Sequence, residues 1–189
     1  MLISELKADL RKKVLAKRIK SHRNFGEVAS ESLSQHLLAF LKKKPARKVA
    51  GYWATGSEMN LTALLFQLDV EGWSVSLPVV IGNDSSLIFR RWRRSDHLSK
   101  GPFKTLQPKP ESEELIPDII LVPLIAFDDE HYRLGQGGGF YDRTLQKFSK
   151  HDIDIVSVGI AFACQQVDVV PRDEHDYCLD FVVTENGFV

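Results

Sequence analysis

The residues best suited to chemistry stand together in residues 133–143, which read RLGQGGGFYDR. Four of the five positions from 135 to 139 are glycine, so the backbone can approach a ligand closely and adopt positive φ angles. Backbone N–H groups in such a loop, followed by the start of a helix, form a site for an anion such as phosphate. The segment therefore predicts a phosphate-binding loop. A plain surface turn, whose glycines only satisfy backbone geometry, is the alternative.

Charged side chains beside the glycines favour the binding interpretation. Arg133 and Arg143 bracket the loop with permanent cations, which suit phosphate. Asp142 is a natural Mg²⁺ ligand there, because Mg²⁺ prefers one or two carboxylates with phosphate oxygens and water. Its alternative role is a first-turn carboxylate that interacts with the helix dipole. The segment is neither a Walker A loop, which needs GK[ST], nor a dinucleotide-binding fingerprint, because its third glycine falls one position early.

A strand and a helix must flank this loop. The apolar run DIILVPLIA, residues 118–126, is typical of a strand buried on both faces, and a helix is expected at 140–150. Further strands are expected at 48–53, 73–80, 86–91, 153–161 and 181–184, further helices at 4–22, 25–43 and 61–70, and a long proline-containing loop at 95–117. Because strands alternate with helices, we predict an α/β fold with a mainly parallel sheet and one domain over residues 1–189.

Apolar residues should face the core from the first two helices. In the second helix these are Val28, Leu33, Leu37, Leu38 and Leu41. The other faces of the first helix are strongly basic, and on spacing alone they are interpreted as solvated. Those basic residues are Lys7, Arg11, Lys12, Lys13, Lys17, Arg18, Lys20 and Arg23.

Composition excludes several classes of protein. The 189 residues carry 25 Lys and Arg against 25 Asp and Glu, whereas a nucleic-acid-binding protein usually has a basic surplus. The basic first helix and the run FRRWRR at 89–94 are the features that such a binding protein would use.

No apolar run reaches the length of a membrane span, and the N-terminus lacks the apolar core of a signal peptide. We therefore expect a cytoplasmic protein with no nucleic-acid or membrane partner. Cys164 and Cys178 match no metal or redox motif and are expected to be packed thiols.

The stretch LVPLIAFDDEHYRLGQGGGFYDR, residues 121–143, resembles the signature of the 5-formyltetrahydrofolate cyclo-ligase family, also called methenyltetrahydrofolate synthetases. That signature reads approximately VPxxAFDxxGxRLGxGxGYYDR. The resemblance continues in KxxLR at 7–11, in the segment that ends at Glu58 and in PxxxxD at 171–176, so it covers nearly the whole chain. It implies an α/β/α sandwich similar to NagB/RpiA/CoA-transferase-like folds. The implied enzyme is an ATP-dependent cyclo-ligase that converts 5-formyltetrahydrofolate to 5,10-methenyltetrahydrofolate with MgATP and releases ADP and phosphate.

The resemblance also implies a role for each matching residue. ATP would be bound by Lys7, Arg11, Arg133, Leu134, Gly135, Gln136, Gly137, Gly138, Gly139, Phe140 and Tyr141. The folate would be bound by Trp53, Glu58, Gln136, Gly137, Gly138, Gly139 and Phe140. Catalysis would involve Arg133, Tyr141 and Arg143, and Mg²⁺ would be bound by Asp142 and Asp176.

From the residues alone, other interpretations stay open. Trp53 is also typical of a core residue, and Glu58 of a charge at a helix N-terminus. Asp173, Glu174 and Asp180 stand close to Asp176 in the sequence and are alternatives for its role.

The chain departs from the family pattern in and before the loop. It has no lysine among the glycines, Phe140 replaces a common tyrosine, and His131 or Tyr132 stands where glycine is frequent. These departures bear on the turnover rate and leave the phosphate loop and the carboxylates in place. We expect a monomer that acts on folate, including polyglutamylated forms whose acidic tail Arg91 and Arg93 would attract. A paralogue that keeps the ATP loop but uses another substrate is the alternative, and Trp53 and Glu58 distinguish the two.

Overall fold

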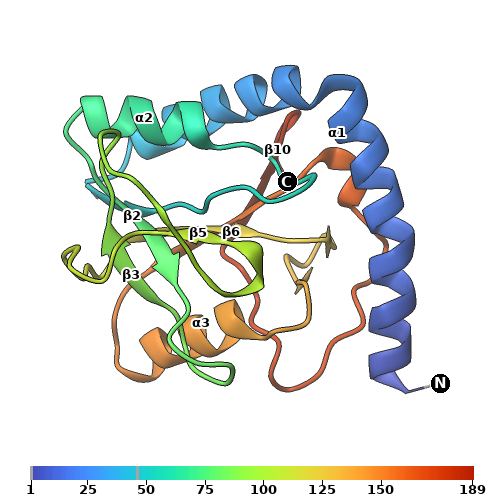
Figure 1. The fold of residues 1–189 in the computed structure, drawn as a ribbon. Helices are drawn as coiled ribbons and strands as arrows, with labels where there is room; N and C mark the ends of the chain where they lie inside the picture. The colour runs from blue at the N-terminus through green and yellow to red at the C-terminus, as the bar shows by residue number, and fades with distance from the viewer. Residues whose placement is uncertain (1, 46) are drawn as a thin grey trace.

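The computed structural model describes residues 2–45 and 47–189, and seven of its strands form one central sheet (Figure 1). In spatial order these are β11 (Gly187–Phe188), β10 (Phe181–Thr184), β9 (Val156–Ile160), β6 (Ile119–Pro123), β1 (Lys48–Ala50), β2 (Ser74–Val79) and β3 (Ile88–Arg91). The five inner strands pair in parallel, and both edge strands are antiparallel. The predicted α/β class with a mainly parallel sheet is confirmed.

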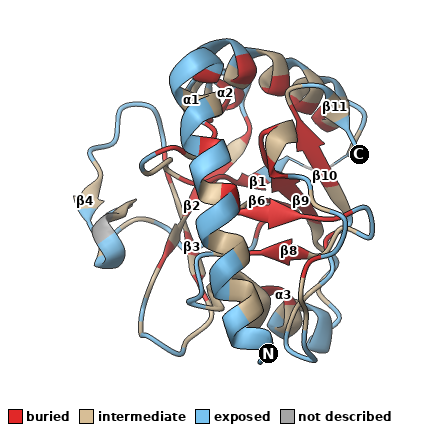
Figure 2. Ribbon diagram, turned by 90° about the vertical axis from the view of Figure 1, so that its right-hand side faces the viewer, coloured by how far each residue is buried: buried red, intermediate tan, exposed pale blue. Residues whose placement is uncertain are grey.

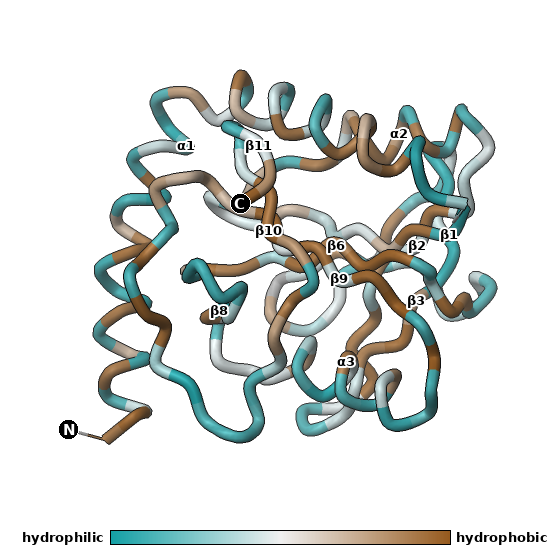
Figure 3. The backbone as a smooth tube through the Cα atoms, turned by 180° about the vertical axis from the view of Figure 1, so that it is seen from behind, coloured by the Kyte–Doolittle hydropathy of each residue, from teal (hydrophilic) through white to brown (hydrophobic). Residues whose placement is uncertain are grey.

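Helices cover both faces of this sheet, and successive residues of β6 show why. Ile119 and Leu121 pack in one apolar cluster with α1 (Ile3–Leu41) and α2 (Thr62–Val70). Ile120 and Val122 belong to a second cluster, under α3 (Phe140–Lys150). Neighbouring residues of a strand point to opposite faces, so a strand buried on both sides must be apolar throughout. Figure 2 shows the buried strands between the helices, and Figure 3 shows their hydrophobic character.

The first two predicted helices form one bent element. The bend is at Phe25, whose φ of −151° and ψ of 22° are not helical. The first half of α1 runs along one side of the molecule, and the second half lies across the sheet (Figure 1). The expectation that Val28 is buried was wrong, because it is 69% exposed. The buried stripe of the second half follows Ala29, Leu33 and Leu37 at four-residue spacing and leaves Val28 beside it.

Several boundaries differ from the prediction. The apolar run at 118–126 is interrupted after β6, and its last residues form β7 (Ala126–Phe127), which pairs with β8 (Arg133–Leu134) in a hairpin. The expected long loop at 95–117 contains β4 (Ser99–Lys100), the short 3₁₀ helix η1 (Pro102–Lys104) and β5 (Leu106–Gln107). Strands of two residues are too short for a periodic pattern to reveal them.

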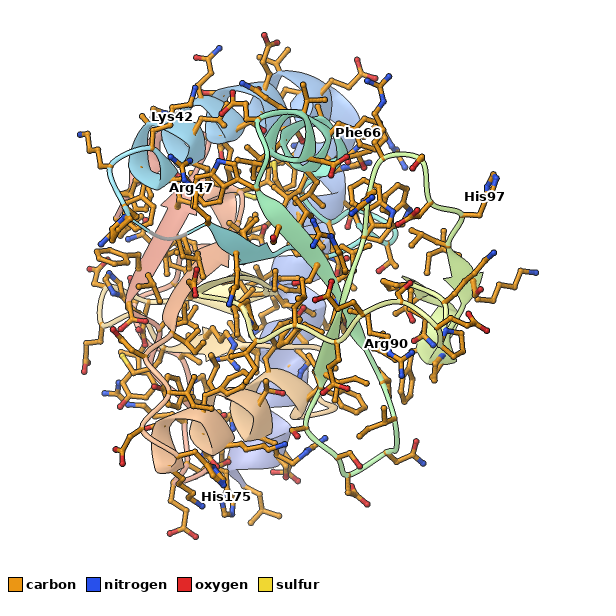
Figure 4. The ribbon with its side chains drawn as sticks, turned by 90° about the vertical axis from the view of Figure 1, so that its left-hand side faces the viewer. Lys42, Arg47, Phe66, Arg90, His97 and His175 are labelled. Atoms are coloured by element: carbon orange, nitrogen blue, oxygen red, sulfur yellow. The ribbon has the colours of Figure 1, made fainter. Side chains whose placement is uncertain are left out.

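Two smaller expectations can also be compared with the structure. The first three residues of the run FRRWRR belong to β3, which is an edge strand, and Trp92 follows β3, buried and stacked on Phe66 of α2. Figure 4 labels Phe66 and Arg90 on these elements. Both cysteines are free, but Cys178 is exposed, so the expectation of two packed thiols was wrong for it. Within residues 2–45 and 47–189, no helix is long and apolar enough to cross a membrane.

Candidate active site

A cleft of about 870 Å³ opens where β1, β2 and β6 end. Every residue to which the family resemblance assigned a role lines this cleft. The carboxyl ends of parallel strands are the usual location of ligand sites in open α/β sheets. A larger and more open groove of about 1490 Å³ lies between α1 and α2. It shares only Thr55 and Gln136 with the cleft, and Gln136 is the one predicted site residue in its lining.

The glycine-rich loop connects β8 to α3 and forms one wall of the cleft. Gly137 (φ 108°) and Gly139 (φ 64°) have positive φ angles that other residues rarely adopt, and Gly139 directly precedes α3. Arg11 of α1 donates from Nε to the carbonyl oxygen of Gly135 at 2.8 Å. A Cβ on Gly137 would lie 3.7 Å from the Arg11 guanidinium. The loop is therefore held against a cation from a distant part of the chain, which a plain surface turn does not require.

The buried Arg133 forms an ion pair with the partly exposed Asp142 beside this loop. The NH2 group of Arg133 donates to Oδ1 of Asp142 at 2.8 Å, and NH1 donates to the carbonyl oxygen of Tyr177 at 2.8 Å. Burial lowers the pKa of the Arg133 guanidinium, and the charge of Asp142 opposes this shift. The Tyr177 N–H also donates to Oδ1 of Asp142, at 3.0 Å. Oδ2 of Asp142 accepts no hydrogen bond within the described residues, so it is available to a ligand.

The acidic segment 173–176 is held by Lys7 of α1. Lys7 Nζ lies 2.6 Å from Oδ2 of Asp176 and 2.9 Å from Oδ2 of Asp173. Burial alone would lower the pKa of Lys7, but the hydrogen bonds and charges of both aspartates raise it above its ordinary value. Asp180, in contrast, accepts hydrogen bonds from Ser157 at 2.7 Å and does not line the cleft. Of the alternatives to Asp176, only Asp173 therefore belongs to the site.

Asp142 and Asp176 lie on the same side of the cleft, because Tyr177 follows Asp176 in the chain and donates to Asp142. Gln146 of α3 supports this arrangement by donating to the carbonyl oxygen of His175 at 2.8 Å, and Figure 4 shows His175 beside α3. No group of three or more His, Cys, Asp or Glu side chains suited to a metal occurs in the part of the chain that the structure describes. Two carboxylates, completed by phosphate oxygens and water, match the preference of Mg²⁺.

Glu58 and Tyr141 provide the polar groups deeper in the cleft. Oε2 of Glu58 accepts hydrogen bonds from the backbone N–H and Oγ1 of Thr55, at 2.8 and 3.1 Å. Burial and the nearby charge of Glu58 raise the pKa of the Tyr141 phenol well above 10, so this group stays protonated and can donate. Trp53 lines the cleft and also packs edge-on against Trp92, with ring centroids 5.8 Å apart. It has both a core contact and a face toward the site.

Arg143 lies at the outer end of the loop. Its NH2 group donates to the carbonyl oxygens of Gly138 and Asn83 at 2.8 and 3.1 Å, and Nε donates to that of Ser85 at 3.3 Å. The guanidinium also lies 5.0 Å from the centre of the Phe140 ring. These contacts join the glycine loop to the turn before β3.

The sequence analysis missed several residues that line the cleft. The β4–β5 hairpin contributes Phe103, Thr105 and Leu106, and the Phe103 ring lies 5.6 Å from that of Phe140. Tyr52 and Thr55 contribute from the segment after β1, and Gln146 from α3. Phe103 stands out in the sequence as an aromatic residue in a proline-containing stretch. No local feature of the sequence, however, indicates that it lies beside the glycine-rich loop, which follows it by more than thirty residues.

The sheet, the cleft and the glycine-rich loop at its edge are the features of an α/β enzyme. The sequence model of the 5-formyltetrahydrofolate cyclo-ligase family matches residues 3–185, and the chain belongs to this family. The 5-formyltetrahydrofolate cyclo-ligase of Haemophilus influenzae is 34% identical over 153 residues, 78% of this chain and 81% of that protein. The enzyme of the same name from Escherichia coli K12 is 35% identical over 144 residues, 74% and 78% of the two chains.

Two solved structures share the fold. The 5,10-methenyltetrahydrofolate synthetase of Aquifex aeolicus has a TM-score of 0.81 and 35% identity, and the alignment covers 97% of this chain and 91% of that one. The corresponding synthetase of Mycoplasma pneumoniae has a TM-score of 0.74 and 26% identity, with coverage of 95% and 98%. The likeness therefore extends over almost the full length of both proteins.

Proposed function

We propose that this protein uses ATP to cyclise 5-formyltetrahydrofolate to 5,10-methenyltetrahydrofolate, with release of ADP and phosphate. The observation that carries the proposal is the convergence in one cleft of a glycine loop, cations from α1, two aspartates and Glu58. These are the groups needed to hold a triphosphate and a second, hydrogen-bonding substrate side by side. The names of the relatives supply the substrate class.

The chemistry follows from the formyl group, which is an amide whose oxygen is a poor leaving group. Transfer of the γ-phosphoryl group breaks its bond to the bridging oxygen of ADP and forms a bond to the formyl oxygen. N10 then attacks the formyl carbon and loses its proton, the carbon–oxygen bond breaks, and phosphate leaves. A protein assists such a transfer mainly by positioning the groups and neutralising charge.

Residues of this chain can meet both needs. Lys7, Arg11 and the N–H groups of the glycine loop face the place proposed for the phosphates, and Lys7 would exchange its aspartate partners for phosphate oxygens. The neutral Tyr141 phenol would donate a hydrogen bond toward the reacting oxygens. We assign positioning roles to Arg133 and Arg143, because their guanidinium groups are engaged with Asp142 and with backbone carbonyl oxygens.

Asp142 and Asp176 would hold Mg²⁺, and the unengaged Oδ2 of Asp142 is the observation that supports this fit. When bound, the ion neutralises phosphate charge. Glu58 would accept hydrogen bonds from pterin N–H groups, and Trp53 would contact the ring. We also propose that the enzyme acts as a monomer.

The test is an absorbance assay. Purified protein is mixed with 5-formyltetrahydrofolate, ATP and Mg²⁺, and the near-ultraviolet band of methenyltetrahydrofolate is followed, with a control without ATP. We expect ATP-dependent growth of the band. A folded, ATP-binding protein that produces no band would overturn the substrate and favour a paralogue with another carbonyl substrate.

The variant Asp142→Asn tests the proposed metal site in the same assay. Asp142→Asn removes a carboxylate charge at the proposed phosphoryl-transfer centre, and this should lower kcat/KM by about 10²–10³-fold. Asp154→Asn, which changes an exposed aspartate elsewhere, is the matched control and should retain full activity. Full activity of Asp142→Asn would refute its role.

A further inference from the structure

Three basic side chains on one face of the first half of α1 reach three different segments of the cleft region. Lys7 contacts Asp173 and Asp176, and Arg11 contacts Gly135. Arg18 follows Arg11 by seven residues, two turns of helix further along the same face. It contacts Ser57 and the carbonyl of Leu124. The proposed function gives roles to Lys7 and Arg11 but leaves Arg18 without one.

Arg18 is a buried charge, because only 3% of the residue is exposed. Its Nε donates to Oγ of Ser57 at 3.1 Å, and NH1 donates to the carbonyl oxygen of Leu124 at 3.2 Å. No carboxylate of the described residues forms an ion pair with it. Burial lowers the pKa of this guanidinium, and the strongest opposing influence is the charge of Glu58. Burying a cation without a direct ionic partner costs free energy. Two hydrogen bonds to neutral groups could be made by an uncharged side chain, so they do not by themselves explain why an arginine occupies this position.

The two acceptors of Arg18 belong to the segments that must be held relative to one another. Ser57 immediately precedes Glu58, and on the other side of Glu58 the Tyr52 hydroxyl donates to the carbonyl oxygen of Met59 at 2.8 Å. Leu124 directly follows β6 and leads into the β7–β8 hairpin, from which the glycine loop starts. One guanidinium therefore connects the turn that carries Glu58 to the segment that carries the loop.

We propose that Arg18 is a positioning residue for the folate substrate. Its hydrogen bonds to Ser57 and Leu124 fix the position of Glu58 relative to the glycine loop. The pterin bound by Glu58 and the phosphates bound by the loop are thereby held with the formyl group next to the γ-phosphate. This inference rests on the proposed function, because it takes Glu58 as the substrate-binding acid.

The test measures binding of each substrate separately by calorimetry, in the absence of the other. Arg18→Gln should weaken binding of 5-formyltetrahydrofolate by about 10–100-fold, the effect of losing hydrogen bonds to a charged group, and change ATP binding by less than about threefold. Arg18→Lys keeps the charge but loses the two-pronged geometry, so it should recover only part of the affinity. Arg23→Gln, at an exposed arginine on the same half of the helix, is the matched control and should bind both substrates normally.

A double-mutant cycle separates positioning from a general contribution to folding. If Arg18 acts through Glu58, Arg18→Gln should cost less than about threefold in folate affinity when Glu58→Gln is already present. Additive losses, equal losses for ATP and folate, or unchanged folate affinity in Arg18→Gln would each overturn the inference. If Arg18→Gln does not fold, Ser57→Ala takes its place, because it removes one hydrogen-bond acceptor of Arg18 and leaves the charge. This variant should then show the same selective loss of folate affinity, and its effect should again be non-additive with that of Glu58→Gln.

Failure of the proposed function would be recognised separately. A wild-type protein that neither binds nor converts 5-formyltetrahydrofolate contradicts the proposed function before any variant is made. An active wild type whose Glu58→Gln variant binds folate normally contradicts the role of Glu58. An active wild type with a normal Arg18→Gln variant contradicts only the role of Arg18.

Discussion

The two halves of α1 have the same secondary structure, but the second half buries an apolar face and the first half buries both an apolar and a charged side chain, Val14 and Arg18. The first half directs Lys7, Arg11 and Arg18 to polar partners in and beside the cleft. The second half packs apolar side chains on the sheet, namely Ala29, Leu33, Leu37 and Leu41. The bend at Phe25 separates them. The comparison teaches that the second half is fixed mainly by apolar contacts, whereas the first half combines an apolar anchor at Val14, packed with Ile125 and Ala126, with charges that it carries to the site.

The largest expected effect is on stability and comes from the second half. Leu37 is fully buried, so Leu37→Ala should leave a cavity and lower the free energy of unfolding by about 2–5 kcal/mol. Urea unfolding measures this loss, and kcat/KM of the protein that remains folded should stay within about twofold of wild type. Gln35→Ala, at an exposed position of the same half, is the control. A parallel loss of kcat/KM would show that the two halves are not separable.

A smaller effect, on function, is expected from the first half. Arg11→Met removes the cation that holds Gly135 and faces the proposed phosphates, so KM for ATP should rise about tenfold, equivalent to roughly 1.4 kcal/mol. The free energy of unfolding should change by less than about 1 kcal/mol. Lys12→Met, one residue along and exposed, should leave KM unchanged. If Arg11→Met destabilised the protein as much as Leu37→Ala, the first half would have to be regarded as core.

The same comparison shows what the sequence could and could not predict. The helix at 140–150 and the strand at 181–184 have the bounds expected from the sequence, because their signals lie within a few neighbouring residues. Arg18 was placed on a solvated basic face, and this was wrong. Whether a cation on a helix is solvated depends on what packs over it, and here Ser57 and Leu124 lie 39 and 106 residues away. For Lys7 and Arg11, spacing alone also favoured solvent, and only the family resemblance indicated the cleft.

The smallest expected effect concerns Tyr52, a buried residue that lines the cleft and is connected through Met59 to the second half of α1. Its hydroxyl donates to the carbonyl oxygen of Met59, and Sδ of Met59 lies 3.3 Å from Oγ of Ser30 in the second half. Burial raises the pKa of the Tyr52 phenol well above its ordinary value of 10, and the charge of Glu58 adds to this shift. Above pH 10 the unfolded chain therefore loses a proton that the folded protein keeps.

The sign of the pH dependence follows from this difference in proton binding. The stabilisation is fully present below pH 10 and is lost as the pH rises toward the higher folded-state pKa, at up to about 1.4 kcal/mol per pH unit. Tyr52→Phe removes this dependence together with a hydrogen bond that contributes about 1 kcal/mol. Urea unfolding of both proteins from pH 8 to pH 11 should therefore give curves that start about 1 kcal/mol apart and converge. Parallel curves would mean that the phenol is ionised with equal ease in the folded and unfolded states, so that Tyr52 does not form a closed, water-free contact between the cleft and the second half of α1.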